Sequence, residues 1–158
     1  MNTVVALPAR SVPMIIESDL LGPIEVDAED LIHFADGLLG FPECRDFVLL
    51  PASRGGLYWL QSVEQAPLAF LLADPFLFCP GYSVELGPAE CSDLEASEAS
   101  DIVILSIVTL PRRDQTVVTT NLQGPLAINL ARGRGRQVVL SDSVFGVRSV
   151  IELDAALG

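Results

Sequence analysis

Hydrophobic residues recur along the chain in short runs that are rich in β-branched and aromatic side chains, and glycine or proline separates these runs. This pattern is typical of the short strands of an all-β sandwich or barrel. We therefore predict an all-β, single-domain antiparallel β-sandwich or barrel, with strands at residues 13–17, 29–34, 46–50, 57–62, 67–73, 82–86, 102–110, 116–121, 125–130, 136–141 and 147–152.

Three segments refine this prediction. The run from Ile102 to Leu110 is apolar at both odd and even positions, which predicts a central strand covered on both sides. The segment Pro88 to Glu98 predicts one short helix, because proline suits a first helical turn and Glu90 favours the positive end of the helix. The glycines of Arg132-Gly-Arg-Gly-Arg136 predict a hairpin loop between two strands.

The composition fits one folded domain. Of the 158 residues, 50% are hydrophobic and 19% charged, so we expect a single unit over residues 1–158, frayed at 1–10 and 153–158. The three cysteines lack C-x-x-C spacing, which favours reduced thiols in a cytoplasm. The N-terminus lacks the pattern of a secretory signal and the longest apolar run is too short for a bilayer, so we expect a soluble, cytoplasmic protein without membrane partners.

The charge favours a basic partner. The chain has 21 acidic and 9 basic residues, a net charge of -12. Direct nucleic-acid binding is therefore disfavoured, because a chain of this charge repels phosphate. All nine basic residues are arginine, which excludes lysine-based covalent catalysis. Residues 1–101 carry -14 and residues 102–158 carry +2, so the acidic surface is expected to lie in the first two thirds.

No set of residues predicts catalysis, a cofactor or a metal site. The single histidine, His33, lies in a strand-like context and is expected to pair with a neighbouring polar group. His33 and a thiol of Cys44, Cys79 or Cys91 could form a dyad, but nothing nearby marks an activated thiol. The alternative function is therefore a small ligand-binding or enzymatic β-barrel with its site in the barrel mouth near His33.

Two charged segments allow more than one interpretation. Arg132, Arg134 and Arg136 would project to one side of an extended segment, which is compatible with RNA binding but more typical of a solvated turn. The stretch from Glu90 to Asp101 holds five acids and no base. It is typical of a solvated helix face, and the functional alternative is a docking surface for a basic partner.

Several blocks in order along the chain carry a family resemblance. Phe34-Ala-Asp-Gly-Leu-Leu-Gly-Phe41 is similar to an F-x-x-G-L-x-G-F turn. Further blocks follow in the same order, namely Phe47 to Pro51, Leu60 to Ser62, Phe70 to Phe76, Tyr82 to Leu86, Thr120 to Asn129 and Gln137 to Leu140. From Ile15 to Ile151 the chain resembles the flagellar assembly factor FliW family.

The resemblance implies a non-enzymatic regulator with two mutually exclusive partners. Family members bind the translational repressor CsrA, which relieves repression of flagellin mRNA, and they also bind flagellin, which frees the repressor. Exposed groups beside the family-like turns are the expected contact residues: Asp74, Phe76, Tyr82, Glu85, Asn121, Gln123 and Asn129. For the two asparagines the alternative is a bond to their own backbone, and for Asp74 it is a turn-forming role.

Overall fold

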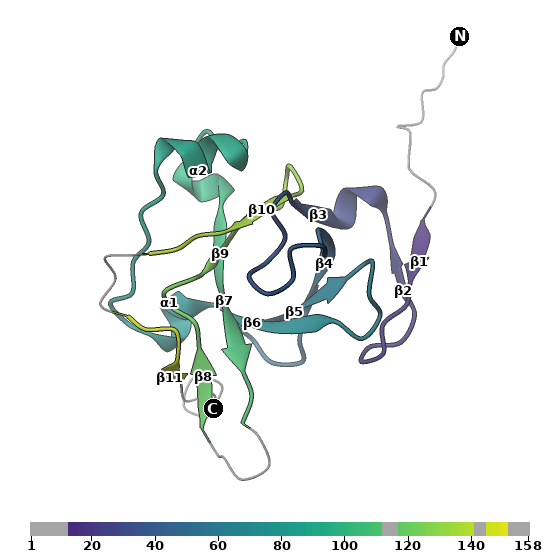
Figure 1. The fold of residues 1–158 in the computed structure, drawn as a ribbon, viewed down its shortest axis with the longest axis horizontal. Helices are drawn as coiled ribbons and strands as arrows, with labels where there is room; N and C mark the ends of the chain where they lie inside the picture. Colours follow the sequence, from purple (N-terminus) through teal and green to yellow (C-terminus); the bar gives the residue numbers. More distant parts are fainter. Residues whose placement is uncertain (1–12, 112–116, 141–144, 152–158) are drawn as a thin grey trace.

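The computed structural model describes residues 13–111, 117–140 and 145–151. Figure 1 shows a curved sheet wrapped on itself, with a two-stranded sheet near the N-terminal end and helix α2 on the opposite side. The strands are β1 (Met14–Ile16), β2 (Ile24–Val26), β3 (Leu31–Phe34), β4 (Asp46–Pro51), β5 (Leu57–Ser62), β6 (Ala69–Ala73), β7 (Val103–Thr109), β8 (Val118–Thr120), β9 (Leu126–Asn129), β10 (Arg134–Gln137) and β11 (Ser149–Ile151). The helices are α1 (Pro75–Phe78) and α2 (Pro88–Asp93), with 3-10 turns η1 (Ala28–Asp30) and η2 (Ala99–Asp101).

Seven strands close into a barrel. Their order is β7-β6-β5-β4-β3-β10-β9, and β9 pairs back onto β7. The predicted all-β barrel is thus confirmed, with one exception to its antiparallel pairing, because β3 and β10 run parallel. Strands β8 and β11 extend the sheet beyond β7, whereas β1 and β2 form their own sheet.

The barrel interior is filled by alternate residues of its strands. In β3, Ile32 and Phe34 are buried while His33 is half-exposed, which is the alternation that a strand with one solvated face produces. The ring of Phe34 packs edge-on against Phe47 at 5.5 Å between centroids. Phe34 also restricts the residue type at position 135 on the paired strand, because a Cβ at Gly135 would lie 2.4 Å from the Phe34 ring. Only glycine fits there.

A buried glutamine secures the β5–β6 side of the barrel. The Gln61 side chain donates from Nε2 to the carbonyls of Ser62, Gln65 and Ala66, and its Oε1 accepts from the Ser18 hydroxyl at 2.7 Å. All of its polar atoms are therefore satisfied, as burial requires. These bonds tie the β5–β6 turn to the turn between β1 and β2.

Some predicted elements differ from the structure. Residues 82–86 form no strand, since their backbone pairs with no neighbouring strand. Tyr82 is nevertheless buried, and its side chain bonds the Leu122 carbonyl. The prediction missed β2 and helix α1, and α2 ends at Asp93 rather than near residue 98. Strand β7 is central, because it pairs with neighbouring strands on both sides. Near the two ends of the predicted run, however, Val103 and Leu110 are exposed. The prediction that the run is covered on both faces was therefore wrong at its ends.

The predicted hairpin is present, since β9 and β10 pair antiparallel, but its turn lies at residues 130–133. The prediction of a loop through Arg136 was wrong, because Arg134 to Arg136 pair with β9 as part of β10. The predicted frayed ends, residues 1–10 and 153–158, lie outside the described residues. In the part of the chain that the structure describes, no helix has the length and apolar character needed to cross a bilayer.

Candidate functional site

Helix α1 presents the most exposed aromatic ring among the predicted contact residues. Asp74 precedes the helix, and its Oδ1 accepts the backbone N–H of Phe76 at 3.0 Å, while Pro75 occupies the first turn. This is a standard helix start, so Asp74 has the turn-forming role that was its alternative interpretation. The short helix leaves Phe76 48% exposed and its neighbour Leu77 similarly open.

Tyr82 supports this surface from beneath. It is only 5% exposed, so it is not the exposed anchor that the sequence suggested. Its ring lies 5.7 Å from that of Phe76 and 5.1 Å from that of Phe145, and its hydroxyl donates to the Leu122 carbonyl at 2.7 Å. Burial, with a smaller contribution from nearby Cys79, raises the pKa of Tyr82 to about 12.

The turn after β8 lies next to this aromatic group through Leu122. The Oδ1 atom of Asn121 accepts the backbone N–H groups of Gln123 and Gly124, at 3.1 and 2.9 Å. Such a side-chain-to-backbone turn is the local role expected as the alternative for this asparagine. The half-buried Gln123 accepts the Leu140 N–H at its carbonyl.

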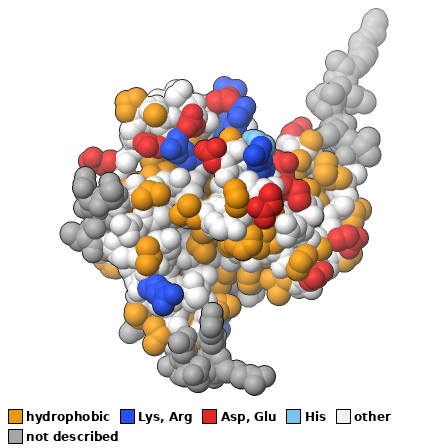
Figure 2. Space-filling model, viewed as in Figure 1, with side chains coloured by type: hydrophobic (Ala, Val, Ile, Leu, Met, Phe, Trp, Pro, Cys, Tyr) orange, Lys and Arg blue, Asp and Glu red, His pale blue; other side chains and the backbone are white. Residues whose placement is uncertain are grey.

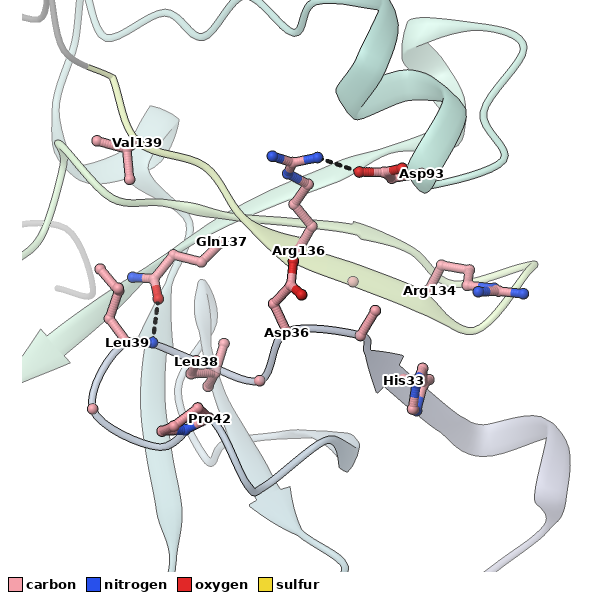
Figure 3. A pocket seen from close by; sticks show the side chains of 14 residues that line it. His33, Asp36, Leu38, Leu39, Pro42, Asp93, Arg134, Arg136, Gln137 and Val139 are labelled. Atoms are coloured by element: carbon pink, nitrogen blue, oxygen red, sulfur yellow. Dashed lines mark hydrogen bonds and ion pairs between the residues drawn. The ribbon is translucent and has the colours of Figure 1, made fainter.

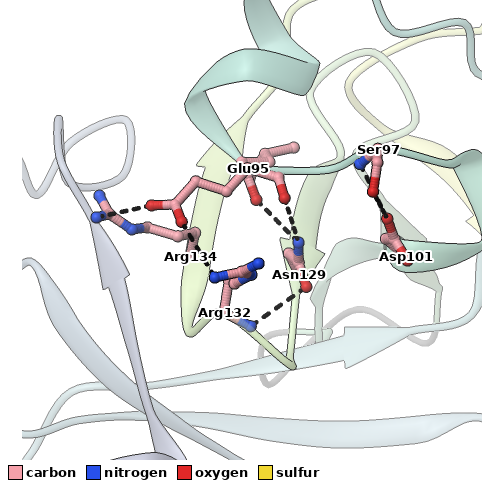
Figure 4. A network of polar contacts seen from close by, with 7 residues as sticks. Glu95, Ser97, Asp101, Asn129, Arg132 and Arg134 are labelled. Atoms are coloured by element: carbon pink, nitrogen blue, oxygen red, sulfur yellow. Dashed lines mark hydrogen bonds and ion pairs between the residues drawn. The ribbon is translucent and has the colours of Figure 1, made fainter.

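The remaining predicted residues lie apart from this group. Asn129 is buried at the end of β9, where its Nδ2 donates to the Leu94 and Glu95 carbonyls and its Oδ1 accepts the Arg132 N–H (Figure 4). Its contacts are internal. Glu85 is exposed in the segment before α2, and the structure shows no contact that joins it to Phe76 or Asn121.

The acidic segment after Pro88 and the arginine-rich hairpin are joined by ion pairs. Glu95 pairs with Arg134 at 2.9 Å and lies 3.9 Å from Arg132, as Figure 4 shows, and Asp93 pairs with Arg136. The sequence pattern missed this pairing because about forty positions separate the partners. The arginines therefore do not form an uncompensated basic patch for RNA, and two of the five acids of the segment, Asp93 and Glu95, are paired with them.

Within the same segment, Asp101 accepts the backbone N–H groups of Glu98 and Ser97, at 2.9 and 3.0 Å. These bonds, first that from Glu98, lower the pKa of the Asp101 carboxyl below its usual range. The carboxylate thus closes the turn before β7 and has a local structural role.

A groove of about 510 Å³ opens beside His33 (Figure 3). His33 Nδ1 lies 2.8 Å from Asp46 Oδ1, which confirms the expected pairing with a polar neighbour. The alternative function expected a site near His33, and the groove lies there. Its lining includes His33, Asp36, Leu38, Leu39, Pro42, Asp93, Arg134, Arg136, Gln137 and Val139.

The catalytic alternative requires a thiol and a carboxylate beside His33. A carboxylate is present, but no cysteine lines the groove, and Cys44 is buried. Burial, followed by Glu43 and Glu64, raises the pKa of the Cys44 thiol, which opposes formation of a nucleophilic thiolate. Among the described residues no group of three or more side chains could hold a metal ion.

Comparisons with known proteins point in one direction. Residues 15–151 match the family described as FliW protein. The chain is 40% identical over 131 residues to the flagellar assembly factor FliW of Natranaerobius thermophilus, covering 82% of this chain and 87% of that protein. It is 34% identical over 145 residues to that of Treponema denticola, covering 90% and 98%. A crystal structure of the flagellar assembly factor FliW has a TM-score of 0.80 at 30% identity, covering 87% of this chain and 96% of that one.

Proposed function

The chain belongs to the FliW family of flagellar assembly factors, and from this we propose that it regulates flagellar assembly without enzymatic activity. In the cytoplasm it binds the translational repressor CsrA and relieves the repression of flagellin mRNA. Flagellin competes for the same protein and frees the repressor again. The observation that carries the proposal is the family match over residues 15–151.

The distribution of charge supports a basic protein as partner. Between Glu17 and Glu64 the chain has ten acids and two arginines. Figure 2 shows acidic side chains along the side of the molecule formed by β1 to β3, while acids and arginines intermingle near α2. An RNA-binding repressor must be positive where it holds phosphate, so the net acidic charge of the chain would attract it over long range and repel its RNA.

The contact surface is proposed to centre on α1 and the turn after β8. Phe76 is the exposed aromatic anchor, and Tyr82 holds it in place from below. Asp74, Asn121 and Gln123 would form the polar rim, and the exposed Glu85 would add charge from the segment before α2. The buried Asn129 acts indirectly, because it fixes the end of α2 rather than touching a partner.

Calorimetry of the full chain against the CsrA of the same organism tests the proposal. We expect saturable binding, loss of that binding when flagellin is added first, and release of a flagellin mRNA leader from CsrA when the chain is titrated in. Absence of binding to CsrA would contradict the proposal. His33→Ala serves as a control, since binding should be unchanged in a variant that remains folded.

A further inference from the structure

The groove beside His33 lies where β10 continues past the end of its partner β3. Strand β10 pairs with β9 from Arg134 through Gln137, but it pairs with β3 only at Arg134 and Gly135. After Phe34 the chain turns away from the sheet, with Gly37 at a φ of +65°. Among the described residues no strand occupies the place beside residues 136–139. The barrel wall therefore has an empty strand position there (Figure 3).

The backbone along this position faces the groove. The N–H of Val138 donates to the Pro125 carbonyl and that of Leu140 donates to the Gln123 carbonyl, both at 2.8 Å. Since backbone groups alternate in direction along an extended chain, those of Gln137 and Val139 point the opposite way. Within the described chain, the N–H and carbonyl of Val139 form no hydrogen bond. They present the unpaired edge that an added strand needs.

The walls supply apolar contacts at fixed positions. Val139 is 64% exposed on one wall and Leu39 is similarly exposed on the other. Gln137 holds the two walls at their spacing, because its Oε1 accepts the Leu39 N–H at 2.9 Å while its Nε2 donates to the Gly124 carbonyl. Two exposed aliphatic side chains beside an open backbone edge favour an occupant that buries an apolar residue.

One charge in the groove lacks a partner in the described chain. His33 pairs with Asp46, Arg134 with Glu95, and Arg136 with Asp93. The carboxylate of Asp36 also lines the groove, but no hydrogen bond or ion pair from the described residues reaches it. An occupant with a positive charge would therefore complement the groove.

We propose that this groove binds an extended segment of a partner protein, added as a strand beside β10. An apolar side chain of the segment packs against Leu39 and Val139, and a lysine or arginine pairs with Asp36. The edge from Arg136 to Val139 is roughly 13 Å long, enough for about four residues of the segment. Backbone bonds supply affinity in this mode of recognition, and alternate side chains supply specificity. The inference goes beyond the function proposed above and does not depend on CsrA or flagellin.

An mRNA-display selection tests the site. A library of random decapeptides is selected for binding to the full chain, which is immobilised as bait. We expect the enriched peptides to have apolar residues at every second position and a lysine or arginine close to them in sequence. In fluorescence anisotropy with the synthesised peptides, Val139→Glu should weaken binding at least about tenfold, because a charge then occupies the apolar wall. Val150→Glu is the matched control, since Val150 is also 64% exposed but lies on β11, outside the groove.

Two further measurements separate the parts of the site. Asp36→Asn should weaken peptide binding severalfold and flatten its salt dependence, whereas Asp19→Asn, an exposed acid outside the groove, should not. In a series of peptides, each with one backbone amide N-methylated, binding should be lost when the methylated amide is one that faces β10. Because the selection uses no flagellar partner, its failure and the failure of the proposed function are distinguishable.

The outcomes that overturn the inference are equally specific. The inference is wrong if the selection gives no enrichment over beads without the chain. It is also wrong if the enriched peptides bind Val139→Glu as tightly as the wild type, or if N-methylation at every amide leaves their binding unchanged. Wild-type self-association that Val139→Glu abolishes would assign the groove to a second copy instead. If Val139→Glu fails to fold by circular dichroism, Leu39→Asp on the opposite wall provides the same comparison.

Discussion

The hydroxyl of Tyr82 donates a hydrogen bond of 2.7 Å to the carbonyl of Leu122, forty positions further along the chain. This bond connects the segment after α1 to the turn after β8. The same ring packs against Phe76, so the exposed aromatic side chain of the proposed contact surface rests on a buried tyrosine.

The first prediction concerns the stability that this bond provides. Tyr82→Phe keeps the ring contacts but leaves the Leu122 carbonyl without its donor, so the free energy of unfolding should fall by about 1 to 2 kcal/mol. Urea denaturation at pH 7 measures this. A variant as stable as the wild type would show that water replaces the hydroxyl.

The same pair of proteins should differ in pH dependence. The pKa of Tyr82 is raised from about 10 to about 12 by folding, so between these values the folded chain keeps a proton that the unfolded chain loses. This contribution is fully present below pH 10 and is lost as the pH rises towards 12. The stability difference between wild type and Tyr82→Phe should therefore shrink over that range.

Asn129 gives the second prediction. Its amide satisfies carbonyls at the end of α2 and its Oδ1 satisfies the Arg132 N–H, all from a buried position. Asn129→Ala should lower the free energy of unfolding by about 2 kcal/mol, because the buried Leu94 carbonyl and the part-buried Arg132 N–H lose their partner. Gln123→Ala, at a half-buried turn position, should change it by no more than about 0.5 kcal/mol. Thermal denaturation of the two variants under one buffer gives the comparison.

Glu95 carries the third prediction. It has a φ of +54° at the end of α2, where its N–H bonds the Ser92 carbonyl and the next N–H bonds the Cys91 carbonyl. Glycine usually occupies this left-handed position. Glu95→Ala and Glu95→Gly both remove the ion pairs with the arginines, but only glycine relieves the strain. Glu95→Gly should thus be about 1 kcal/mol more stable than Glu95→Ala in urea denaturation. Equal stability would mean that the backbone shifts out of this conformation.

The barrel and the hairpin were predictable because strand patterns and glycine turns are local. Ile32 and Phe34 alternate with His33, and that spacing alone indicates which side chains face the core. The pairing of Asp93 with Arg136 was not predictable, since only the closed barrel brings α2 onto β10. A site near His33 was one of the alternatives, but the extent of the groove along β10 was not predictable for a similar reason. It depends on where β3 stops pairing with β10, and no local pattern around Phe34 or Gly135 indicates that position.

The fourth prediction concerns the proposed aromatic anchor. Phe76→Ala should weaken CsrA binding by about 1 to 3 kcal/mol, mainly through faster dissociation. An aromatic side chain that becomes buried in the complex chiefly determines how long the complex lasts. Leu130→Ala is a suitable control, since Leu130 is also 48% exposed but lies at the end of β9. Surface plasmon resonance separates the rates. An unchanged dissociation rate for Phe76→Ala would remove α1 from the contact surface.

The last prediction concerns the acidic charge, which is -14 over residues 1–101. If it steers a basic repressor, the association rate should fall as salt shortens the Debye length below about 8 Å, while dissociation changes less. Asn is also a good helix N-cap, so Asp74→Asn combined with Glu85→Gln should remove charge with little effect on α1.

Stopped-flow association across a salt series measures this directly. The double variant should associate more slowly than the wild type and with a shallower salt dependence. A second double variant, Glu25→Gln with Glu29→Gln, changes the net charge equally but lies at β2 and η1, on a different part of the chain. A larger effect at Asp74 and Glu85 would support a contact near α1, equal effects would indicate steering by net charge alone, and a larger effect at Glu25 and Glu29 would contradict the proposed contact surface and favour the acidic side formed by β1 to β3. A flat salt profile in the wild type would contradict charge steering altogether, because two opposite charges that attract before contact must respond to screening.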